Sequence, residues 1–348
     1  MPDVRVVPPP GLSDNRASLS PSRSPMPTVA ITDYTFPNLD IERSILEPTG
    51  CELISGQAKS PEALIPLVAQ ADAVITQFAP VNASVIEAMQ RARVIVRYGI
   101  GVDNVDLEAA KRKGIPVCNV PDYCIDEVAD HTLAFILALT RQVVPNALHI
   151  REGKWGLACD LQAMRTMKDQ TVGIIGFGRI GREVVERLRP FKPTILVHDP
   201  VVDPEAISKF GAKPIGLEGL LAQSDIVSLH CPSTPQTKRI LNRQSIEAMK
   251  TGSIVINLAR GDLIETAALA EGLQSGKLSF AAIDVCDPEP IPSDSPLRSL
   301  PNVIAASHIA SASPKAVRKL RESAAHHAAN AILKRPLSHI VNGVQPTV

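Results

Sequence analysis

Three side chains in the last third of the chain have the chemistry needed to bind an anion and move a proton. Arg260 offers a fixed fork of donors that suits a carboxylate and a neighbouring carbonyl oxygen. His308 can carry a proton near neutral pH, and Glu289 could orient the imidazole and favour its protonated form. The residues alone leave alternatives open. Arg260 could form an ordinary salt bridge, Glu289 could be a loop acid, and His230 could supply the acid–base imidazole instead.

Near-continuous apolar runs predict the sheet that would position these side chains, because strands of a parallel sheet are covered on both faces. The six runs are 172–175, 195–198, 225–230, 253–258, 280–285 and 302–307. Ligands of such sheets bind beyond the carboxyl ends of the strands. The groups at those ends are a glycine loop, Asp199, His230, Arg260, Asp284 with Glu289, and His308. We therefore expect one site at this edge.

The glycine loop has the pattern of a dinucleotide-binding turn between a strand and a helix. Gly176 permits a tight turn, Gly178 lets a diphosphate approach the backbone, and Gly181 allows close helix packing. The helix N-terminus favours a phosphate anion. Asp199, at the end of the next strand, can accept hydrogen bonds from an adenosine ribose. No arginine in the segment 198–203 would bind a 2′-phosphate, so NAD is favoured over NADP.

The first part of the chain predicts a second parallel sheet, since short apolar runs alternate there with helical segments. The runs are 28–34, 51–55, 71–77, 93–98 and 115–119. No phosphate-type glycine motif follows any of them. Gly99 and Gly101 could instead expose backbone N–H groups as a small anion-binding nest, although a plain tight turn explains them equally well. Arg97, beside this turn, hints at a second anionic group on the ligand.

A helix is predicted over residues 126–141, with an apolar face wider than a surface helix needs. We expect that face to pack between domains or between subunits. Trp155, in the segment that follows, is expected to be a packing anchor.

The composition limits the classes of protein that the chain can belong to. Its 348 residues predict about two domains, and Lys+Arg and Asp+Glu both number 36, so no broad field attracts nucleic acid or an anionic membrane. No apolar run is long enough to span a membrane. Six scattered cysteines without a C-x-x-C pair indicate reduced thiols in a cytoplasmic protein, and no metal motif is present. Proline-rich residues 1–27 predict a disordered tail, and translation is hypothesised to begin at Met26.

Together these motifs resemble the D-isomer-specific 2-hydroxyacid dehydrogenase family. The ordered set is GFGRIG, HDP, LHCPSTPQT, INLARGDLIE, AAIDVCDPEP and SHIASAS, and RYGIGVDNVDLEAA and NVPDYCIDEVADHTL extend it into the first half. The likeness runs from about Thr28 to His339 and is strongest to phosphoglycerate-dehydrogenase-like and C-terminal-binding-protein-like members. It implies an α/β fold of two Rossmann-like, doubly wound parallel-sheet domains. These are a flavodoxin-like substrate domain (28–119 and 310–343) and an NAD-binding Rossmann domain (120–309).

The resemblance also implies roles for individual residues. Arg260 would bind the substrate carboxylate and carbonyl, and His308 would donate a proton with Glu289 as its partner. His230 then falls in the cofactor pocket. The implied NAD contacts are Gly176, Gly178, Arg179, Ile180, Gly181, Asp199, Cys231, Pro232, Thr237, Leu258, Ala259 and Asp284. The implied substrate contacts are Arg260 and the backbone donors of Ile100 and Gly101, to which the residues themselves add Arg97 and Gly99 as candidates. The 126–141 helix would serve a homodimer.

The implied activity is NAD-dependent interconversion of a small 2-oxo acid and a D-2-hydroxy acid. The alternative from another class is an NAD(H)-sensing, corepressor-like binding protein with little turnover. A formate- or homocysteine-releasing type would require different residues in the cleft. The chain departs from the family at Leu258, where a small polar residue is common, and after His308, where a glycine is common. Compared with many phosphoglycerate dehydrogenases, we expect the serine-binding extension to be absent.

Overall fold

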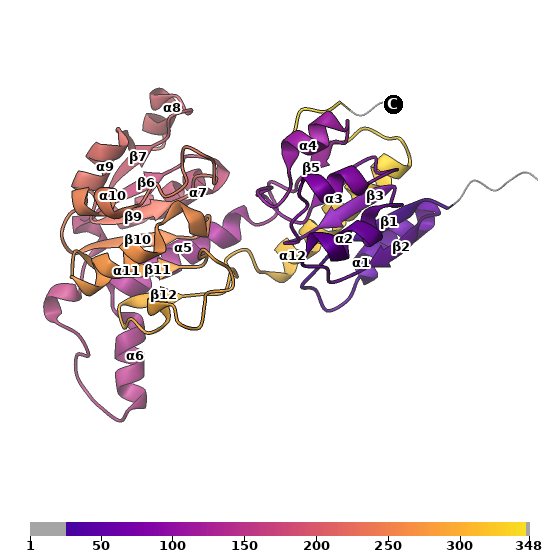
Figure 1. Ribbon diagram of the computed structural model, residues 1–348. Helices are drawn as coiled ribbons and strands as arrows, with labels where there is room; N and C mark the ends of the chain where they lie inside the picture. The colour runs from indigo at the N-terminus through magenta and orange to yellow at the C-terminus, as the bar shows by residue number, and fades with distance from the viewer. Residues whose placement is uncertain (1–25, 346–348) are drawn as a thin grey trace, which may run out of the picture.

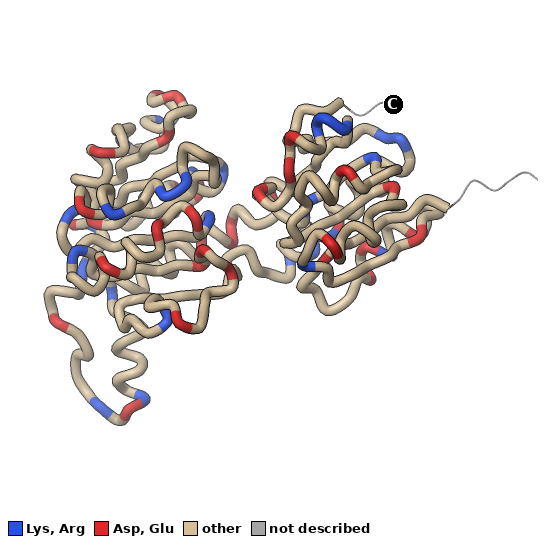
Figure 2. Tube along the Cα trace, in the orientation of Figure 1, with Lys and Arg blue, Asp and Glu red and all other residues tan. Residues whose placement is uncertain are grey.

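The computed structural model describes residues 26–345, which form two α/β units joined by two chain crossings (Figure 1). The predicted tail lies outside the described residues apart from Met26 and Pro27. Each unit is built on one parallel sheet, so the predicted fold class is confirmed. Basic and acidic residues are interspersed over both units (Figure 2).

The first sheet has five parallel strands in the order β2-β1-β3-β4-β5. This is the flavodoxin-like order, in which the chain winds first to one side of β1 and then to the other. The strands are β1 (Thr28–Ile31), β2 (Glu52–Ser55), β3 (Ala73–Thr76), β4 (Ile95–Arg97) and β5 (Val117–Cys118). The central strands β3 and β4 are buried along their whole length, which explains their unbroken apolar sequences.

The first unit's helices come from both ends of the chain. They are α1 (Asp40–Leu46), α2 (Pro61–Val68), α3 (Ala83–Ala88), α4 (Leu107–Arg112) and α12 (Pro314–Ile332), with the short 3₁₀ turn Glu47–Thr49. Helices α3 and α4 begin where Asn82 and Asp106 accept backbone N–H groups at 3.1 and 2.9 Å. Helix α12 lies among the earliest elements in Figure 1 and packs against α1, β3 and β4.

A buried ion pair fixes α12 to this unit. Arg321 on α12 donates two hydrogen bonds to Glu42 on α1, at 2.9 and 2.6 Å, and both side chains are almost completely buried. The Tyr98 hydroxyl donates to the same carboxylate at 2.9 Å. The C-terminal helix is therefore held by specific polar contacts as well as by its alanine-rich face.

The second sheet has seven parallel strands in the order β12-β11-β10-β9-β6-β7-β8. Reading outward from β6, this is the Rossmann arrangement with one additional strand, β12. The strands are β6 (Thr171–Ile175), β7 (Thr194–His198), β8 (Lys213–Pro214), β9 (Ile226–Leu229), β10 (Ser253–Asn257), β11 (Leu278–Ile283) and β12 (Val303–Ala305). The six predicted strands are present, and the two-residue edge strand β8 was missed.

Helices cover both faces of this sheet. They are α5 (Ile125–Thr140), α6 (Val143–Arg151), α7 (Arg179–Leu188), α8 (Pro204–Lys209), α9 (Leu217–Gln223), α10 (Arg243–Ala248) and α11 (Thr266–Gln274). Short 3₁₀ turns lie at Leu161–Ala163, Met167–Asp169, Arg189–Phe191, Gly261–Leu263 and Pro296–Arg298.

The predicted 126–141 helix is present as α5. We expected its wide apolar face to pack between domains or between subunits, but much of this face packs within the second unit. Val128, Phe135 and Leu139 are buried in the core of the second unit, where α5 packs against α7, β10 and β11. The next helix, α6, projects from the unit in Figure 1. Trp155, expected to anchor packing, is 92% exposed.

Among residues 26–345 no single helix has the length and apolarity to cross a membrane. Helices α5 and α6 reach that composition only as a pair, and the pair is bent by 64°.

Candidate active site

The two units enclose a cleft of about 1440 Å³. The first unit lines it with Phe78, Arg97 and Asp103, and the second unit lines it with Arg260 and the pair Glu289 and His308. The three side chains predicted to carry the chemistry therefore line one space, together with residues from the opposite unit.

Glu289 and His308 form a hydrogen-bonded pair. The Nδ1 atom of His308 lies 3.1 Å from Oε2 of Glu289, and the other carboxylate oxygen accepts the N–H of Cys286 at 3.2 Å. Partial burial raises the pKa of Glu289. The hydrogen bond and the charge of His308 lower this pKa by more, so it lies below its usual value. An ionised Glu289 orients the ring through Nδ1 and leaves Nε2 for another partner.

The turn that carries His308 is organised by Asp284, at the end of β11. Asp284 is 1% exposed, and its two carboxylate oxygens accept the N–H groups of Ile309 and Ala310 at 2.9 and 2.8 Å. Its carbonyl accepts the N–H of His308 at 2.8 Å. His308 itself has φ 58°, a left-handed conformation that is uncommon outside glycine. The hydrogen bonds of Asp284 thus stabilise a backbone conformation of His308 that is otherwise unfavourable. They keep the imidazole at the cleft.

Arg260, just after β10, reaches across the cleft to the first unit. Its Nε donates to Oδ1 of Asp103 at 2.9 Å, and its Nη1 donates to the carbonyl of Ala259 at 2.7 Å. Asn257 fixes the same turn by donating to the Arg260 carbonyl at 2.8 Å and accepting the Ala259 N–H at 3.0 Å. Partial burial raises the pKa of Asp103, but Arg260 lowers it by more, so the pKa of this carboxyl lies below its usual value.

The turn from Gly99 to Gly101 lies against two guanidinium groups. A Cβ atom on Gly101 would sit 1.6 Å from Nη2 of Arg260, and a Cβ atom on Gly99 would sit 1.1 Å from Nη1 of Arg97. Gly99 also has φ 150°, a conformation that favours glycine, whereas a side chain at Gly101 would require the Arg260 guanidinium to move. The side chain of Arg97 is buried, its Nη1 donates to the Tyr98 carbonyl at 2.7 Å, and its Nε has no hydrogen-bond partner. Burial and the charge of Arg260 lower its pKa to about 10, so it is charged at neutral pH.

The glycine loop has the geometry that its spacing predicts. Gly176 has φ 96°, and a Cβ atom there would lie 2.5 Å from the backbone N of Cys231. A Cβ atom on Gly181 would lie 2.2 Å from the Gly176 carbonyl, which explains the close approach of α7 to the loop. Gly178, by contrast, faces open space at the start of α7, which has no side-chain cap. Its first N–H groups are therefore available to a diphosphate.

Asp199 follows β7 beside this loop. Its Oδ2 accepts the Phe177 N–H at 2.7 Å, and its Oδ1 accepts the N–H groups of Val201 and Val202 at 2.9 and 3.1 Å. Partial burial raises the pKa of Asp199 and these three hydrogen bonds lower it by more, which keeps the carboxylate ionised. The other predicted NAD contacts in the second unit stand at the same sheet edge, at the start of α7 or after β9, β10 and β11. They are Arg179, Ile180, Cys231, Pro232, Thr237, Leu258, Ala259 and Asp284.

His230 is separate from the acid–base pair. It follows β9, and its Nε2 lies 2.9 Å from the Ser228 hydroxyl. Burial lowers its pKa to about 4, so the ring is neutral near pH 7. His230 does not line the cleft that holds Glu289 and His308, and its place in the cofactor pocket stays a prediction.

The residues that line the cleft but were not predicted from the sequence include Asp33, Phe78 and Asp103. Asp33 and Phe78 follow β1 and β3, at the carboxyl edge of the first sheet. Ligands bind beyond the carboxyl ends of parallel strands, so these two positions carry the same kind of signal as the strand ends of the second sheet. Asp103 lies in the turn after β4 that the sequence singled out, but its contact with Arg260, distant in sequence, has no local signal.

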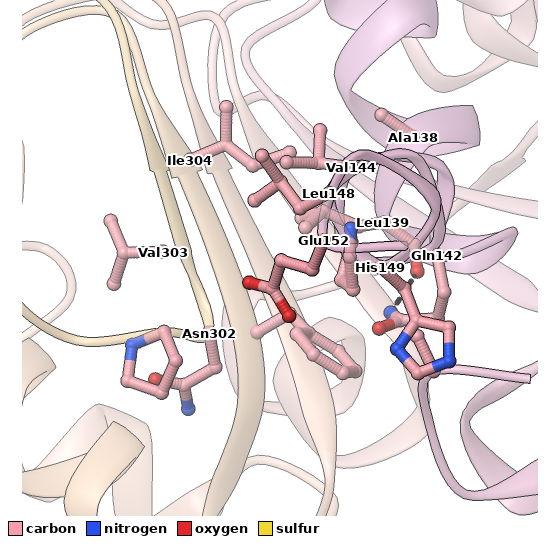
Figure 3. Close-up of a pocket in the computed structure, with 14 residues that line it drawn as sticks. Ala138, Leu139, Gln142, Val144, Leu148, His149, Glu152, Asn302, Val303 and Ile304 are labelled. Carbon is pink, nitrogen blue, oxygen red and sulfur yellow. Dashed lines mark hydrogen bonds between the residues drawn. The ribbon is translucent and has the colours of Figure 1, made fainter. Parts of the chain in front are cut away.

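A smaller hollow of about 340 Å³ lies on the second unit between α5, α6 and β12 (Figure 3). Its walls include Leu139, Val144, Leu148 and Ile304, with His149 and Glu152 at its polar side. None of the predicted site residues lines it. We therefore assign the candidate active site to the cleft between the units.

Comparisons with known proteins agree with this geometry. A model of the NAD-binding domain of D-isomer specific 2-hydroxyacid dehydrogenases matches residues 133–310. The chain is 34% identical over 298 residues to a D-3-phosphoglycerate dehydrogenase of Archaeoglobus fulgidus, covering 85% of this chain and 56% of that protein. It is 35% identical over 271 residues to a glyoxylate reductase of Korarchaeum cryptofilum, covering 77% of this chain and 82% of that protein.

A solved structure extends the likeness to the whole fold. The D-lactate dehydrogenase of Aquifex aeolicus, complexed with NAD and lactic acid, superposes with a TM-score of 0.83 at 27% identity, over 90% of this chain and 99% of that one. The fold and the glycine loop define a two-domain protein of the NAD-binding class. The chain belongs to the D-isomer specific 2-hydroxyacid dehydrogenase family. It spans about half the length of the phosphoglycerate dehydrogenase that it matches.

Proposed function

We propose that this protein is an NAD-dependent oxidoreductase that interconverts a small 2-oxo acid and the corresponding D-2-hydroxy acid. The observation that carries the proposal is the convergence of Arg260 and the Glu289–His308 pair on one cleft, facing the glycine turn of the opposite unit. The named relatives support the same reaction class, since they include a glyoxylate reductase and a D-lactate dehydrogenase.

Binding of the substrate is assigned to both units. Arg260 would hold the carboxylate and polarise the carbonyl oxygen through its guanidinium donors. The backbone N–H groups at Ile100 and Gly101 would bind the same anion from across the cleft. Arg97 adds a second positive charge behind this turn, and we assign it to anion binding as well. The Asp103 carboxylate keeps the Arg260 guanidinium at the turn while the cleft is closed.

Proton transfer is assigned to His308. Glu289 holds Nδ1, so that Nε2 faces the cleft and donates a proton to the substrate oxygen as the alcohol forms. Asp284 keeps the turn in place. The nicotinamide cofactor, when bound, supplies the hydride. The loop Gly176–Gly181 and Asp199 would hold its diphosphate and ribose, with the cleft side of β9 and β10 completing the pocket.

The test is NADH oxidation with a panel of glyoxylate, pyruvate, hydroxypyruvate and 3-phosphohydroxypyruvate. At least one should be reduced, and Arg260→Ala should lower kcat/KM for it by at least ~10²-fold, the usual scale for a lost charge clamp. Gly216→Ala is the matched control, because Gly216 is outside the cleft lining, precedes α9 and faces open space. Wild-type rates in Arg260→Ala would remove this assignment.

The second candidate is an NAD(H)-sensing binding protein, for which domain closure matters and turnover does not. The cross-cleft contact between Arg260 and Asp103 is compatible with it, because that contact depends on closure. NADH binding without oxidation of any 2-oxo acid would favour this candidate. The intact Glu289–His308 pair favours the enzyme, since a sensor has no need of a proton donor.

We also propose a homodimer, and we propose that α6 contributes to its surface as well as the predicted 126–141 helix. The apolar face of α5 is already buried within its own unit, whereas α6 exposes Val143, Val144, Leu148 and Ile150 by 42 to 54%. Val144 and Leu148 line the hollow in Figure 3, and α6 is the projecting helix in Figure 1. Exposed apolar area of this kind is typical of a subunit interface.

The six unpaired cysteines support a reducing compartment such as the cytoplasm.

A further inference from the structure

The two N–H groups assigned to the substrate anion belong to successive peptide units of the glycine turn. The N–H of Ile100 shares its peptide unit with the Gly99 carbonyl, and the N–H of Gly101 shares its unit with the Ile100 carbonyl. Both peptide bonds are trans, and in a planar trans peptide the N–H and the C=O point in opposite directions. Whatever holds the two carbonyls from behind therefore sets the direction of the two N–H groups.

Both carbonyls are held by the residues that follow β5. The backbone N–H of Val120 donates to the Gly99 carbonyl at 2.9 Å, and the side-chain Nδ2 of Asn119 donates to the Ile100 carbonyl at 2.6 Å. No backbone carbonyl within residues 26–345 accepts the N–H of Ile100 or of Gly101. The turn thus offers two donors whose direction is set from the end of β5, one through a backbone contact and one through a side chain.

Asn119 is itself fixed by the C-terminal segment of the chain. It is 8% exposed, and its backbone N–H donates to the His339 carbonyl at 3.3 Å. The residue before it, Cys118, forms an antiparallel bridge with Ile340. The backbone of Asn119 is therefore anchored at the edge of the sheet, and its amide reaches from there to the Ile100 carbonyl.

We propose that Asn119 is a positioning residue for the substrate, because it directs the Gly101 N–H toward the carboxylate. This inference rests on the proposed function. Asn119 does not line the cleft, so it acts through the turn and not by touching the substrate. A hydrogen bond accepted by the Ile100 carbonyl also polarises the peptide unit and strengthens its N–H as a donor. A donor of this kind binds the substrate and the transition state alike, so its loss raises KM more than it lowers kcat.

The experiment replaces Asn119 by leucine, which keeps the shape of the side chain and removes its donor. In the full-length protein, KM for the best substrate of the panel should rise by about 10-fold or more, the scale of one hydrogen bond to a charged group. Values of kcat and NADH affinity should stay within about a factor of three. The dissociation constant of oxamate, an unreactive analogue of a 2-oxo acid, from the NADH complex should rise together with KM. Asn119→Ala is a second variant, and thermal unfolding shows that each is folded.

Asn342→Leu is the matched control, because Asn342 makes hydrogen bonds of the same kind at the other end of the same strand. It is also 8% exposed, its Oδ1 accepts the Val117 N–H at 3.1 Å, and its Nδ2 donates to the Ile115 carbonyl at 2.8 Å. Its replacement removes buried contacts of β5 but none with the glycine turn. KM and the oxamate dissociation constant should therefore stay near their original values.

Three results would overturn the assignment. They are an unchanged KM in a folded Asn119 variant, an equal rise of KM in Asn342→Leu, and the failure of both Asn119 variants to fold, which would make the residue structural. If the unmodified protein binds oxamate but reduces no 2-oxo acid, the proposed function fails on its own. A weaker oxamate complex in Asn119→Leu would then still support the positioning role of Asn119 at the anion site.

Discussion

Replacing Gly101 by alanine should disable the proposed substrate clamp without touching a charged residue. The new Cβ atom would lie 1.6 Å from Nη2 and 2.7 Å from Cζ of Arg260, and 2.8 Å from Oδ1 of Asp103. An ordinary contact is about 3.4 Å, so the guanidinium must withdraw by roughly 2 Å. That movement breaks the 2.9 Å hydrogen bond between Arg260 and Asp103.

The size of the effect follows from this displacement. A misplacement of about 1 Å at a catalytic group can cost on the order of 10²-fold in rate, so kcat/KM should fall by at least ~10²-fold. This corresponds to about 2.7 kcal/mol of transition-state stabilisation. The assay is steady-state NADH oxidation with the best substrate of the panel, together with thermal unfolding to show that the variant is folded. Gly216→Ala again serves as the control.

The result that would refute the reasoning is a folded Gly101→Ala protein with kcat/KM within a factor of three of the original. Arg260 would then reach the substrate from another direction, and the glycine turn would not be the opposite wall of the clamp.

Three further predictions concern stability and cofactor binding. Glu42→Ala leaves the Arg321 guanidinium buried without its partner, so the free energy of unfolding in urea should fall by about 3–5 kcal/mol. The pKa of His327 is lowered to about 4 by burial, with His339 and His326 adding to the effect. The unfolded chain therefore takes up this proton first as the pH falls below 6.5, and stability should drop by roughly 2 kcal/mol between pH 7.5 and 5, a loss that His327→Gln reduces. Asp199→Ala removes a charged acceptor beside the glycine loop, so NADH affinity in a fluorescence titration should fall by about 10- to 100-fold, and NADPH affinity by less.

Much of the architecture follows from sequence pattern because parallel strands covered on both faces are unbroken apolar runs. The runs ending at Thr76, Arg97 and Asn257 are buried along their whole length, and each was predicted. Strand β8 was missed for the same physical reason. It consists of Lys213 and Pro214, pairs only at the sheet edge and has no apolar face to detect.

The periodicity of a helix shows which face is apolar, but it does not show which part of the protein covers that face. The stripe through Val128, Phe135 and Leu139 shows correctly that α5 is deeply buried, but not that its own unit covers it. The segment around Trp155 shows the opposite case, in which a large apolar residue predicted to pack is exposed.

The residues of the candidate site were likewise only partly predictable from the sequence. Arg260, Glu289 and His308 follow strands of one sheet, so the strand-end rule brings them together. The contact of Arg260 with Asp103 joins two units, and no local pattern encodes which residue of the other unit will face it. The same holds for Phe78, whose position depends on a carboxylate supplied by the end of a different strand.

The central claim is that His308, oriented by Glu289, transfers a proton to a 2-oxo acid. The most direct measurement is NADH oxidation by His308→Ala, with NADH affinity determined on the same sample. The account predicts that the unmodified protein reduces at least one 2-oxo acid, and that the variant binds NADH within a few-fold of the original while kcat falls by at least ~10²-fold. Equal rates in the two proteins, or no oxidation by the unmodified protein with any 2-oxo acid, would contradict it.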